Sequence, residues 1–327
     1  MATENVILLA GDDATFLRKA AQEAIDLLFR LEQALSRFLP GSDVSLVNAL
    51  AASRPVRVGE DCRRVLELAK RGWEATGGAF DPSVGPLVEA WRAAAEEGRI
   101  PGDDAVERLL ETTGMDGVTL DGSGDVAFEK PGMSLDLGAI GKGYAVDRLV
   151  HRLQELGVPG GAVISGRSSI RTWGVPPGEE RWRFEVAHPE EPGRAIAGLV
   201  AEAGAVSSSS ASEKRYRIRG KDFGHIIDPR SGRPVEGRTR SATVWTRTGA
   251  AGEVLSTGLF VLGTGGPEAA AMARAVPAAF HDAEDREPAR ASALLVLEEP
   301  SMWGGMRVET CFAGPPAFEV EEGQGPK

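Results

Sequence analysis

The sequence is poor in the residues that build disulfide frameworks, zinc sites and histidine-rich catalytic clusters. Its 327 residues include two cysteines, Cys62 and Cys311, and four histidines. Two cysteines so far apart do not indicate a disulfide framework or a zinc site. The histidines form no His-Glu-x-x-His pair, and no Gly-x-Ser-x-Gly motif is present, so neither a zinc protease nor an α/β-hydrolase is indicated.

Long apolar runs and an excess of positive charge are also missing. No apolar run reaches the roughly 18–20 residues of a membrane-spanning helix, so no membrane span is expected. Acidic residues outnumber basic ones by 48 to 37, a net charge of −11, which disfavours a nucleic-acid partner. The short apolar stretch over residues 6–10 follows no basic residue, unlike a secretory signal, and this predicts a cytoplasmic protein.

Helical periodicity dominates the first half of the sequence. A strand is expected over residues 6–9, followed by an amphipathic helix that Asp13 or Thr15 caps. Its apolar residues recur at steps of three and four from Leu17 to Phe38, and Pro40-Gly41 ends it. The remaining expected elements are helices over 61–75, 84–95, 103–113 and 141–156, a hairpin of 118–120 with 126–128, and a short strand over 134–137.

After Gly157 the pattern changes to a period of two, which is typical of strands. We expect strands over 162–165, 182–187, 195–200, 216–219, 242–245, 293–297 and 306–309, two helices over 250–262 and 267–275, and a polar, frayed tail from 319. Helices in the first half and strands in the second favour an α+β fold, with helices packed on an antiparallel sheet. No linker divides the chain, so residues 1–327 are expected to form one domain.

The segment 136–143 reads Asp-Leu-Gly-Ala-Ile-Gly-Lys-Gly and is similar to a P-loop, but it departs from one at both ends. Asp136 stands in place of the first glycine, and Gly143 in place of the magnesium-binding Ser or Thr. A strand, a glycine-rich turn and a helix start remain. The free N–H groups of that helix start and the cation of Lys142 predict a seat for a pyrophosphate, with a plain tight turn as the alternative.

A second cluster runs from His225 to Pro234. Pro229 followed by Ser231-Gly232 predicts a turn, and His225 and Asp228 stand at its entrance. This spacing allows a histidine–carboxylate pair, and it equally allows a turn in which Asp228 only accepts a backbone hydrogen bond.

Five segments, in this order, resemble the ApbE-type FAD:protein FMN transferases. They cover residues 35–48, 80–91 (Phe-Asp-Pro-Ser-Val-Gly-Pro-Leu-Val-Glu-Ala-Trp), 135–147, 225–234 and 253–263. Each motif alone is weak, but five in sequence are specific, and the resemblance is strongest over residues 30–265. It implies a T-fold-like α+β architecture with an antiparallel sheet.

The resemblance also implies a reaction. A magnesium-dependent enzyme of this family transfers the FMN moiety of FAD to a threonine hydroxyl of an acceptor flavoprotein and releases AMP. The implied partners are FAD and a protein with an exposed threonine, and a homodimer is a possible assembly. The alternatives are a relative that only binds FAD or hydrolyses it to FMN and AMP, and a non-catalytic scaffold.

Site residues are implied by position in the family motifs. The carbonyl of Ala139, with Glu253 and Thr257, would hold magnesium, and hard oxygen ligands suit that ion. His225 would act as a base or a phosphate donor, and the geometry of the turn lets Asp228 orient it. The FAD-binding residues implied in the same way are Phe38, Ala90, Trp91, Arg92, Asp136, Lys142 and Ile226.

The sequence differs from the family pattern at four places. Residues 6–11 carry no Met-Gly-Thr triplet. Arg167 stands in the Gly-Gly turn, where it would crowd a ligand or bind its phosphate. Ser208-Ser209-Ser210 replaces a Thr-Ser-Gly turn. Glu253 replaces an aspartate, and its extra methylene is expected to alter magnesium affinity unless the surroundings compensate, because magnesium tolerates little geometric error.

Overall fold

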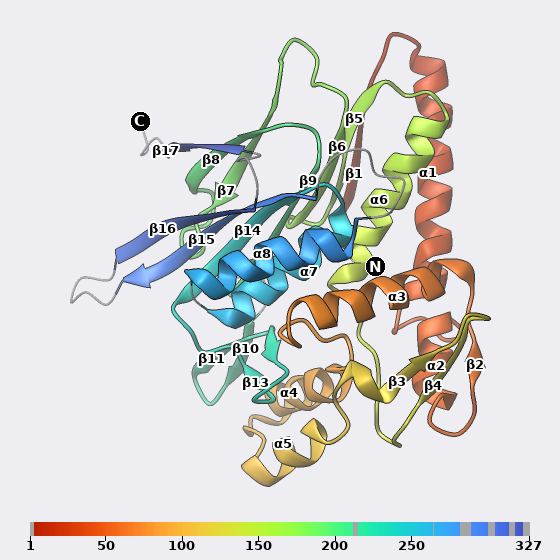
Figure 1. The fold of residues 1–327 in the computed structure, drawn as a ribbon, viewed down its shortest axis with the longest axis vertical. Helices are drawn as coiled ribbons and strands as arrows, with labels where there is room; N and C mark the ends of the chain where they lie inside the picture. Colours follow the sequence, from red (N-terminus) through yellow and green to blue (C-terminus); the bar gives the residue numbers. More distant parts are fainter. Residues whose placement is uncertain are drawn as a thin grey trace.

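A seven-stranded antiparallel sheet forms the centre of the fold, with helices against one face (Figure 1). The computed structural model describes residues 3–211, 215–263, 265–281, 289–299, 305–313 and 318–322. Every pair of neighbouring strands in this sheet is antiparallel. The order is β1 (Asn5–Ala10), β5 (Gly160–Ser165), β6 (Ser169–Trp173), β9 (Ala205–Ser210), β14 (Thr239–Thr246), β15 (Ala291–Glu299) and β16 (Gly305–Ala313).

The helical layer contributes most of the main hydrophobic core. Asp13 caps the long helix α1, accepting hydrogen bonds from the N–H groups of Thr15 and Phe16. Helix α7 is buried on nearly all sides, so it carries apolar and small residues around its whole circumference. The helices are α1 (Ala14–Leu35), α2 (Asp43–Leu50), α3 (Glu60–Ala75), α4 (Gly85–Glu97), α5 (Asp103–Leu110), α6 (Ile140–Glu155), α7 (Gly249–Leu262) and α8 (Pro267–Ala279), with a 3-10 turn over Met115–Gly117.

The second face of the large sheet packs on a small one, formed by β17 (Phe318–Glu322), β8 (Ala195–Ala201) and β7 (Trp182–Ala187). Alternation along the strands divides the two cores, since successive side chains point to opposite faces. On β15, Ala293 and Leu295 join the helical core, whereas Leu294 and Val296 pack with Leu199 of β8. The central sheet is therefore buried on both sides.

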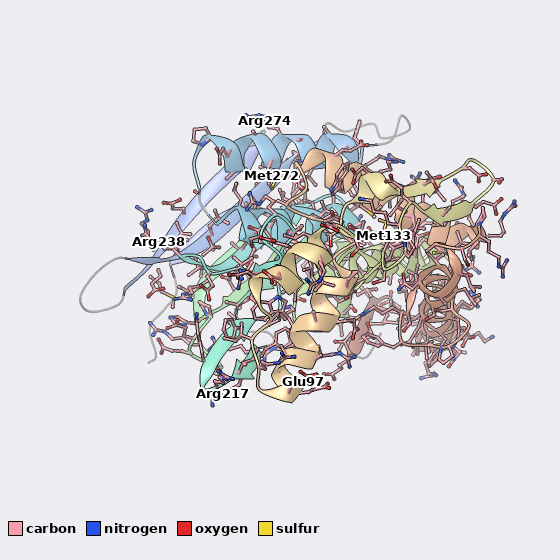
Figure 2. All side chains as sticks on the ribbon, turned by 90° about the horizontal axis from the view of Figure 1, so that it is seen from below. Glu97, Met133, Arg217, Arg238, Met272 and Arg274 are labelled. Atoms are coloured by element: carbon pink, nitrogen blue, oxygen red, sulfur yellow. The ribbon has the colours of Figure 1, made fainter. Side chains whose placement is uncertain are left out.

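A third apolar cluster lies below the sheet, where α4 meets a β-hairpin. The hairpin strands β10 (Arg215–Ile218) and β11 (Lys221–Gly224) place Ile218 and Phe223 against Trp91 of α4. Figure 2, seen from below, labels Arg217 on the hairpin and Glu97 near the end of α4, and Arg219 in the hairpin turn donates to the Gly98 carbonyl at that end (3.2 Å). The remaining short strands are β12 (Ile227–Asp228) with β13 (Arg233–Pro234), and β2 (Val56–Arg57) with β4 (Asp125–Phe128) and β3 (Val118–Leu120).

Helices α6 and α7 approach each other at two glycines. A Cβ placed on Gly143 would lie 2.2 Å from the carbonyl oxygen of Gly249, and one on Gly249 would lie 2.6 Å from that of Gly143. Asp147 of α6 accepts hydrogen bonds from the N–H groups of Gly249 (2.7 Å) and Ala250 (2.9 Å) and pairs with Arg171 (3.2 Å). These contacts fix the start of α7 against α6. They thereby set the relative positions of the side chains farther along the two helices.

We expect Gly143→Ala to lower the free energy of unfolding by about 3 kcal/mol, because the added methyl meets rigid backbone rather than a movable side chain. Urea unfolding followed by circular dichroism measures this. Gly141→Ala in the same helix is the matched control, since its Cβ would meet only the Leu137 Cβ, at 3.9 Å. A small gain of up to about 1 kcal/mol is expected there. Equal stability of the two variants would contradict the close contact.

The α+β prediction is confirmed, and most predicted elements are present. Three local predictions are wrong. The first helix ends at Leu35 and leaves Phe38 outside it. Residues 134–137 form no strand, and only a single parallel bridge joins Ser134 to Val84. Ser208-Ser209-Ser210 lies in strand β9 rather than in a turn. Part of the expected frayed tail is strand β17, and residues 323–327 of that tail lie outside the described residues.

Candidate functional site

The start of α6 and the middle of α7 bring two opposite charges together. The Lys142 Nζ lies 3.7 Å from Oε2 of Glu253, and the Glu253 residue is only 3% exposed. Thr257 follows one turn later on α7, so the two oxygen-bearing side chains share one face of the helix, as their spacing predicts. A buried carboxylate is costly without a cation, and Lys142 supplies one.

Serine hydroxyls of β6, of β9 and of the β5–β6 connection contact the side chains of α6 and α7 at this site. Ser169, fully buried at the start of β6, donates to Oε1 of Glu253, and the Ser168 hydroxyl accepts from the Lys142 Nζ at 2.9 Å. The Ser209 hydroxyl lies 3.4 Å from that of Thr257 and 3.1 Å from that of Ser256. Each functional side chain on α6 and α7 is thus oriented by a strand.

The oxygens at this point have the chemistry that magnesium takes. Ala139 is the residue before α6, and its carbonyl accepts from the Lys142 N–H at 3.2 Å. The Ala139 carbonyl, the Glu253 carboxylate and the Thr257 hydroxyl are all hard oxygen donors, and their joint binding of one ion stays a prediction. Within the described residues no group of three His, Cys, Asp or Glu side chains is placed to hold a metal. A magnesium ion here would therefore need carbonyl, hydroxyl, substrate or water oxygens beside the Glu253 carboxylate.

A charged cluster surrounds Asp136, just before the Lys142 turn. The Asp136 carboxylate accepts from the Gly138 N–H (2.8 Å) and lies 3.2 Å from Nε of Arg37. Arg37 also pairs with Glu89 of α4 (2.6 Å), which in turn accepts from Arg92 (2.6 Å). The Arg37 guanidinium carbon sits 4.5 Å from the ring centre of Phe38, which is 70% exposed. The cluster offers an aromatic face beside fixed charges.

Two pKa values report the electrostatics of this cluster. Burial raises the pKa of Tyr216 on β10, and the nearby Asp136 carboxylate raises it further. Burial also pushes the pKa of Glu89 upward, but hydrogen bonds from Arg92 and Arg37 outweigh it, so that pKa lies below its usual value. Glu89 is thus held as a carboxylate, and Tyr216 as a neutral phenol.

Trp91 is a core residue in this structure. It is 1% exposed, its Nε1 donates to the Gly232 carbonyl at 2.9 Å, and its ring packs 5.3 Å from that of Phe223. Of its two neighbours in the predicted FAD segment, Ala90 is half-buried and Arg92 is exposed. Trp91 therefore ties α4 to the β12–β13 turn, and Arg92 is the member of the segment that presents a polar group to solvent.

We expect Trp91→Phe to lower the free energy of unfolding by about 1–3 kcal/mol, because the buried Gly232 carbonyl loses its donor. Chemical unfolding measures the change. Trp182→Phe is the matched control, since its indole donates to Gly174 at 3.0 Å in an exposed setting where water can replace it. An equally large loss of unfolding free energy in Trp182→Phe would contradict this explanation, because it would show that burial of the acceptor carbonyl does not matter.

The second predicted cluster has a different arrangement from the one expected. The Asp228 carboxylate accepts hydrogen bonds from the backbone N–H and from the guanidinium of Arg230, each at 2.9 Å. Its observed partner is therefore Arg230. His225 is half-buried between β11 and β12, and the carbonyl of the adjacent Ile226 accepts from Val235 at 2.9 Å. The turn reading of Asp228 is supported, and its orienting role toward His225 stays a prediction.

A cavity of about 650 Å³ lies next to the β12–β13 turn. Its lining includes Trp91, Phe223, Asp228, Pro234 and Val261, but not Lys142, Glu253 or Thr257. It therefore borders the β12–β13 turn and the end of α7 without including the candidate metal donors.

Several residues at these clusters were not predicted from the sequence. They are Arg37, Glu89, Ser168, Ser169, Ser209 and Tyr216. Arg37 and Glu89 lie inside two of the segments that resemble the family, 35–48 and 80–91, and that position was the one indication of a role for them. Arg167 is exposed in the turn after β5, and its predicted effect on a ligand stays a prediction.

Comparisons with known proteins agree with the resemblance seen in the sequence. Residues 1–280 match the sequence profile of the ApbE family. The chain is 31% identical over 245 residues to an FAD:protein FMN transferase of Klebsiella pneumoniae, with 74% of this chain and 75% of that protein covered. An FAD:protein FMN transferase of Haemophilus influenzae is 31% identical over 274 residues, covering 80% and 78%.

The fold agrees as well. The crystal structure of the ApbE protein from Thermotoga maritima superposes with a TM-score of 0.77 at 28% identity, covering 93% of both chains. The sheet, the helical layer and the match along the sequence lead to one conclusion: this chain belongs to the ApbE family.

Proposed function

We propose that this protein transfers the FMN moiety of FAD to a threonine hydroxyl of an acceptor protein, with magnesium, and releases AMP. The observation that carries the proposal is the contact of Lys142, at the start of α6, with Glu253 of α7, one turn before Thr257 on the same helix. Relatives named FAD:protein FMN transferase, at about 31% identity over most of the chain, support the reaction class.

The reaction needs an attack on a phosphorus atom that carries negative charge. The threonine oxygen bonds to the phosphorus of the FMN half, and the bond from that phosphorus to the bridging oxygen breaks. That oxygen leaves with AMP, and the hydroxyl proton passes to a base. Magnesium, when bound, would screen the phosphate charges and stabilise the leaving phosphate.

The residues of this chain have distinct roles in the proposal. The N–H groups at the start of α6 and the Lys142 ammonium attract the pyrophosphate. Phe38 offers a ring face to the flavin, and Asp136 and Arg92 offer fixed charges to the nucleotide. His225 accepts the threonine proton or donates a hydrogen bond to a phosphate oxygen.

The test combines the purified protein, FAD and magnesium with a protein extract of the source organism. Covalent flavin is read as fluorescence in a denaturing gel, and AMP by chromatography. We expect both signals, in equal amounts, and neither in EDTA. AMP with free FMN but no labelled protein would indicate hydrolysis instead, and failure to bind FAD at all would favour a scaffold.

A further inference from the structure

Two neighbouring serines after the β5–β6 turn contact the two charged partners of the α6–α7 site separately. Ser168 holds the Lys142 Nζ at 2.9 Å, while Ser169 donates to Oε1 of Glu253. Both serines are buried, and Ser169 is 0% exposed. The two oxygens of the Glu253 carboxylate are thereby distinguished, because Oε1 faces the β6 serine and Oε2 faces the ammonium.

We propose that Ser169 is a positioning residue that adapts this site to glutamate, by holding Oε1 of Glu253 so that Oε2 serves as the carboxylate donor to a divalent cation. The inference rests on the proposed function. It pairs the glutamate on α7, a departure from the family pattern, with a serine that follows a second departure, Arg167, by two positions.

The physical reason is the extra rotatable bond of glutamate. A longer side chain loses more conformational freedom when it is fixed, and a loosely held carboxylate cannot meet the strict octahedral geometry of magnesium. A hydrogen bond to one carboxylate oxygen removes that freedom before the ion binds. Partners that orient metal ligands in this way are worth about 10–100-fold in metal affinity.

The neighbouring strand offers a matched control. Ser207 of β9 is the cross-strand partner of Ser169 and is equally buried, yet its hydroxyl makes no hydrogen bond in the described part of the chain. Ser207→Ala and Ser169→Ala therefore remove the same atom from adjacent buried positions, and of the two only Ser169→Ala removes a hydrogen bond to the Glu253 carboxylate.

The experiment measures Mn²⁺ binding to the full chain without FAD, by electron paramagnetic resonance of the free ion. We expect Ser169→Ala to raise the Kd for Mn²⁺ about 10–100-fold and Ser207→Ala to leave it unchanged. Thermal unfolding without metal checks that both variants fold. Wild-type affinity in Ser169→Ala would overturn the proposal.

Glu253→Asp gives a second test that does not depend on the folding of Ser169→Ala. The shorter side chain draws back from Ser169, so we expect Glu253→Asp to bind Mn²⁺ more weakly than wild type, and Ser169→Ala to cost little more in that background. Equal or tighter binding by Glu253→Asp would show that the serine is not needed. Full Mn²⁺ binding by Glu253→Ala would instead place the metal elsewhere, which contradicts the proposed metal site itself.

Discussion

Glu253→Gln is expected to lower the rate of FMN transfer about 100–1000-fold and to abolish high-affinity Mn²⁺ binding. The substitution keeps the shape of the side chain and an oxygen that can accept from Ser169, but it removes the negative charge. That charge is 3% exposed and lies beside Lys142, so its loss leaves the Lys142 ammonium without its buried carboxylate and removes the charged donor from the proposed metal position.

The rate is followed as covalent flavin on the acceptor at saturating FAD, over a range of magnesium concentrations. Ser256→Ala on the same helix is the control, because Ser256 is buried beside Glu253 but is not among the proposed donors. Transfer by Glu253→Gln at the wild-type rate, with the wild-type dependence on magnesium, would contradict the role of this carboxylate.

His225→Ala is expected to reduce kcat for transfer about 100–10,000-fold while FAD and Mn²⁺ still bind, because a general base acts in the transition state. Stopped assays of AMP release give kcat, and calorimetry gives the FAD affinity. His151→Ala is the matched control, since His151 is exposed on α6 and pairs with Glu155 at 3.0 Å.

The division between kcat and affinity separates the two roles left open for His225. Loss of kcat alone indicates a base, and a parallel loss of FAD affinity indicates a phosphate donor. An unchanged kcat would exclude both. Asp228→Asn should lower kcat far less than His225→Ala, because the contacts of its carboxylate run to Arg230.

The helical half of the site could be predicted because its signals are local. Glu253 and Thr257 lie four residues apart in a continuous apolar segment, which places them on one face of α7. Lys142 follows a glycine-rich turn that opens a helix, so its place in the first turn of α6 was also predictable.

The half of the site that comes from strands β6 and β9 could not be predicted, because the serine-rich sequence there shows little alternation of apolar and polar residues. Ser208 to Ser210 belong to strand β9 although the family pattern places a turn there, since the packing of β9 between β6 and β14 decides their conformation. The contacts of Ser169 and Ser209 with α7 depend on that packing. The ion pair between Arg37 and Glu89 joins residues 52 positions apart, and its geometry exists only in the folded chain.

The burial of Trp91 could not be predicted from its place in a motif. A motif match assigned it to a flavin site, and the fold places its ring in a core with Phe223. Its neighbour Arg92 is exposed and pairs with Glu89 on the same helix, and its role in FAD binding stays a prediction.

The most direct test of the account is a calorimetric titration of the purified, flavin-free protein with FAD, first with magnesium and then with EDTA. We predict binding that magnesium strengthens, with the magnesium effect lost in Glu253→Gln and the binding itself weakened in Lys142→Met. Absence of FAD binding under both conditions, or an affinity indifferent to magnesium and to Glu253, would contradict a flavin transferase site built between α6 and α7.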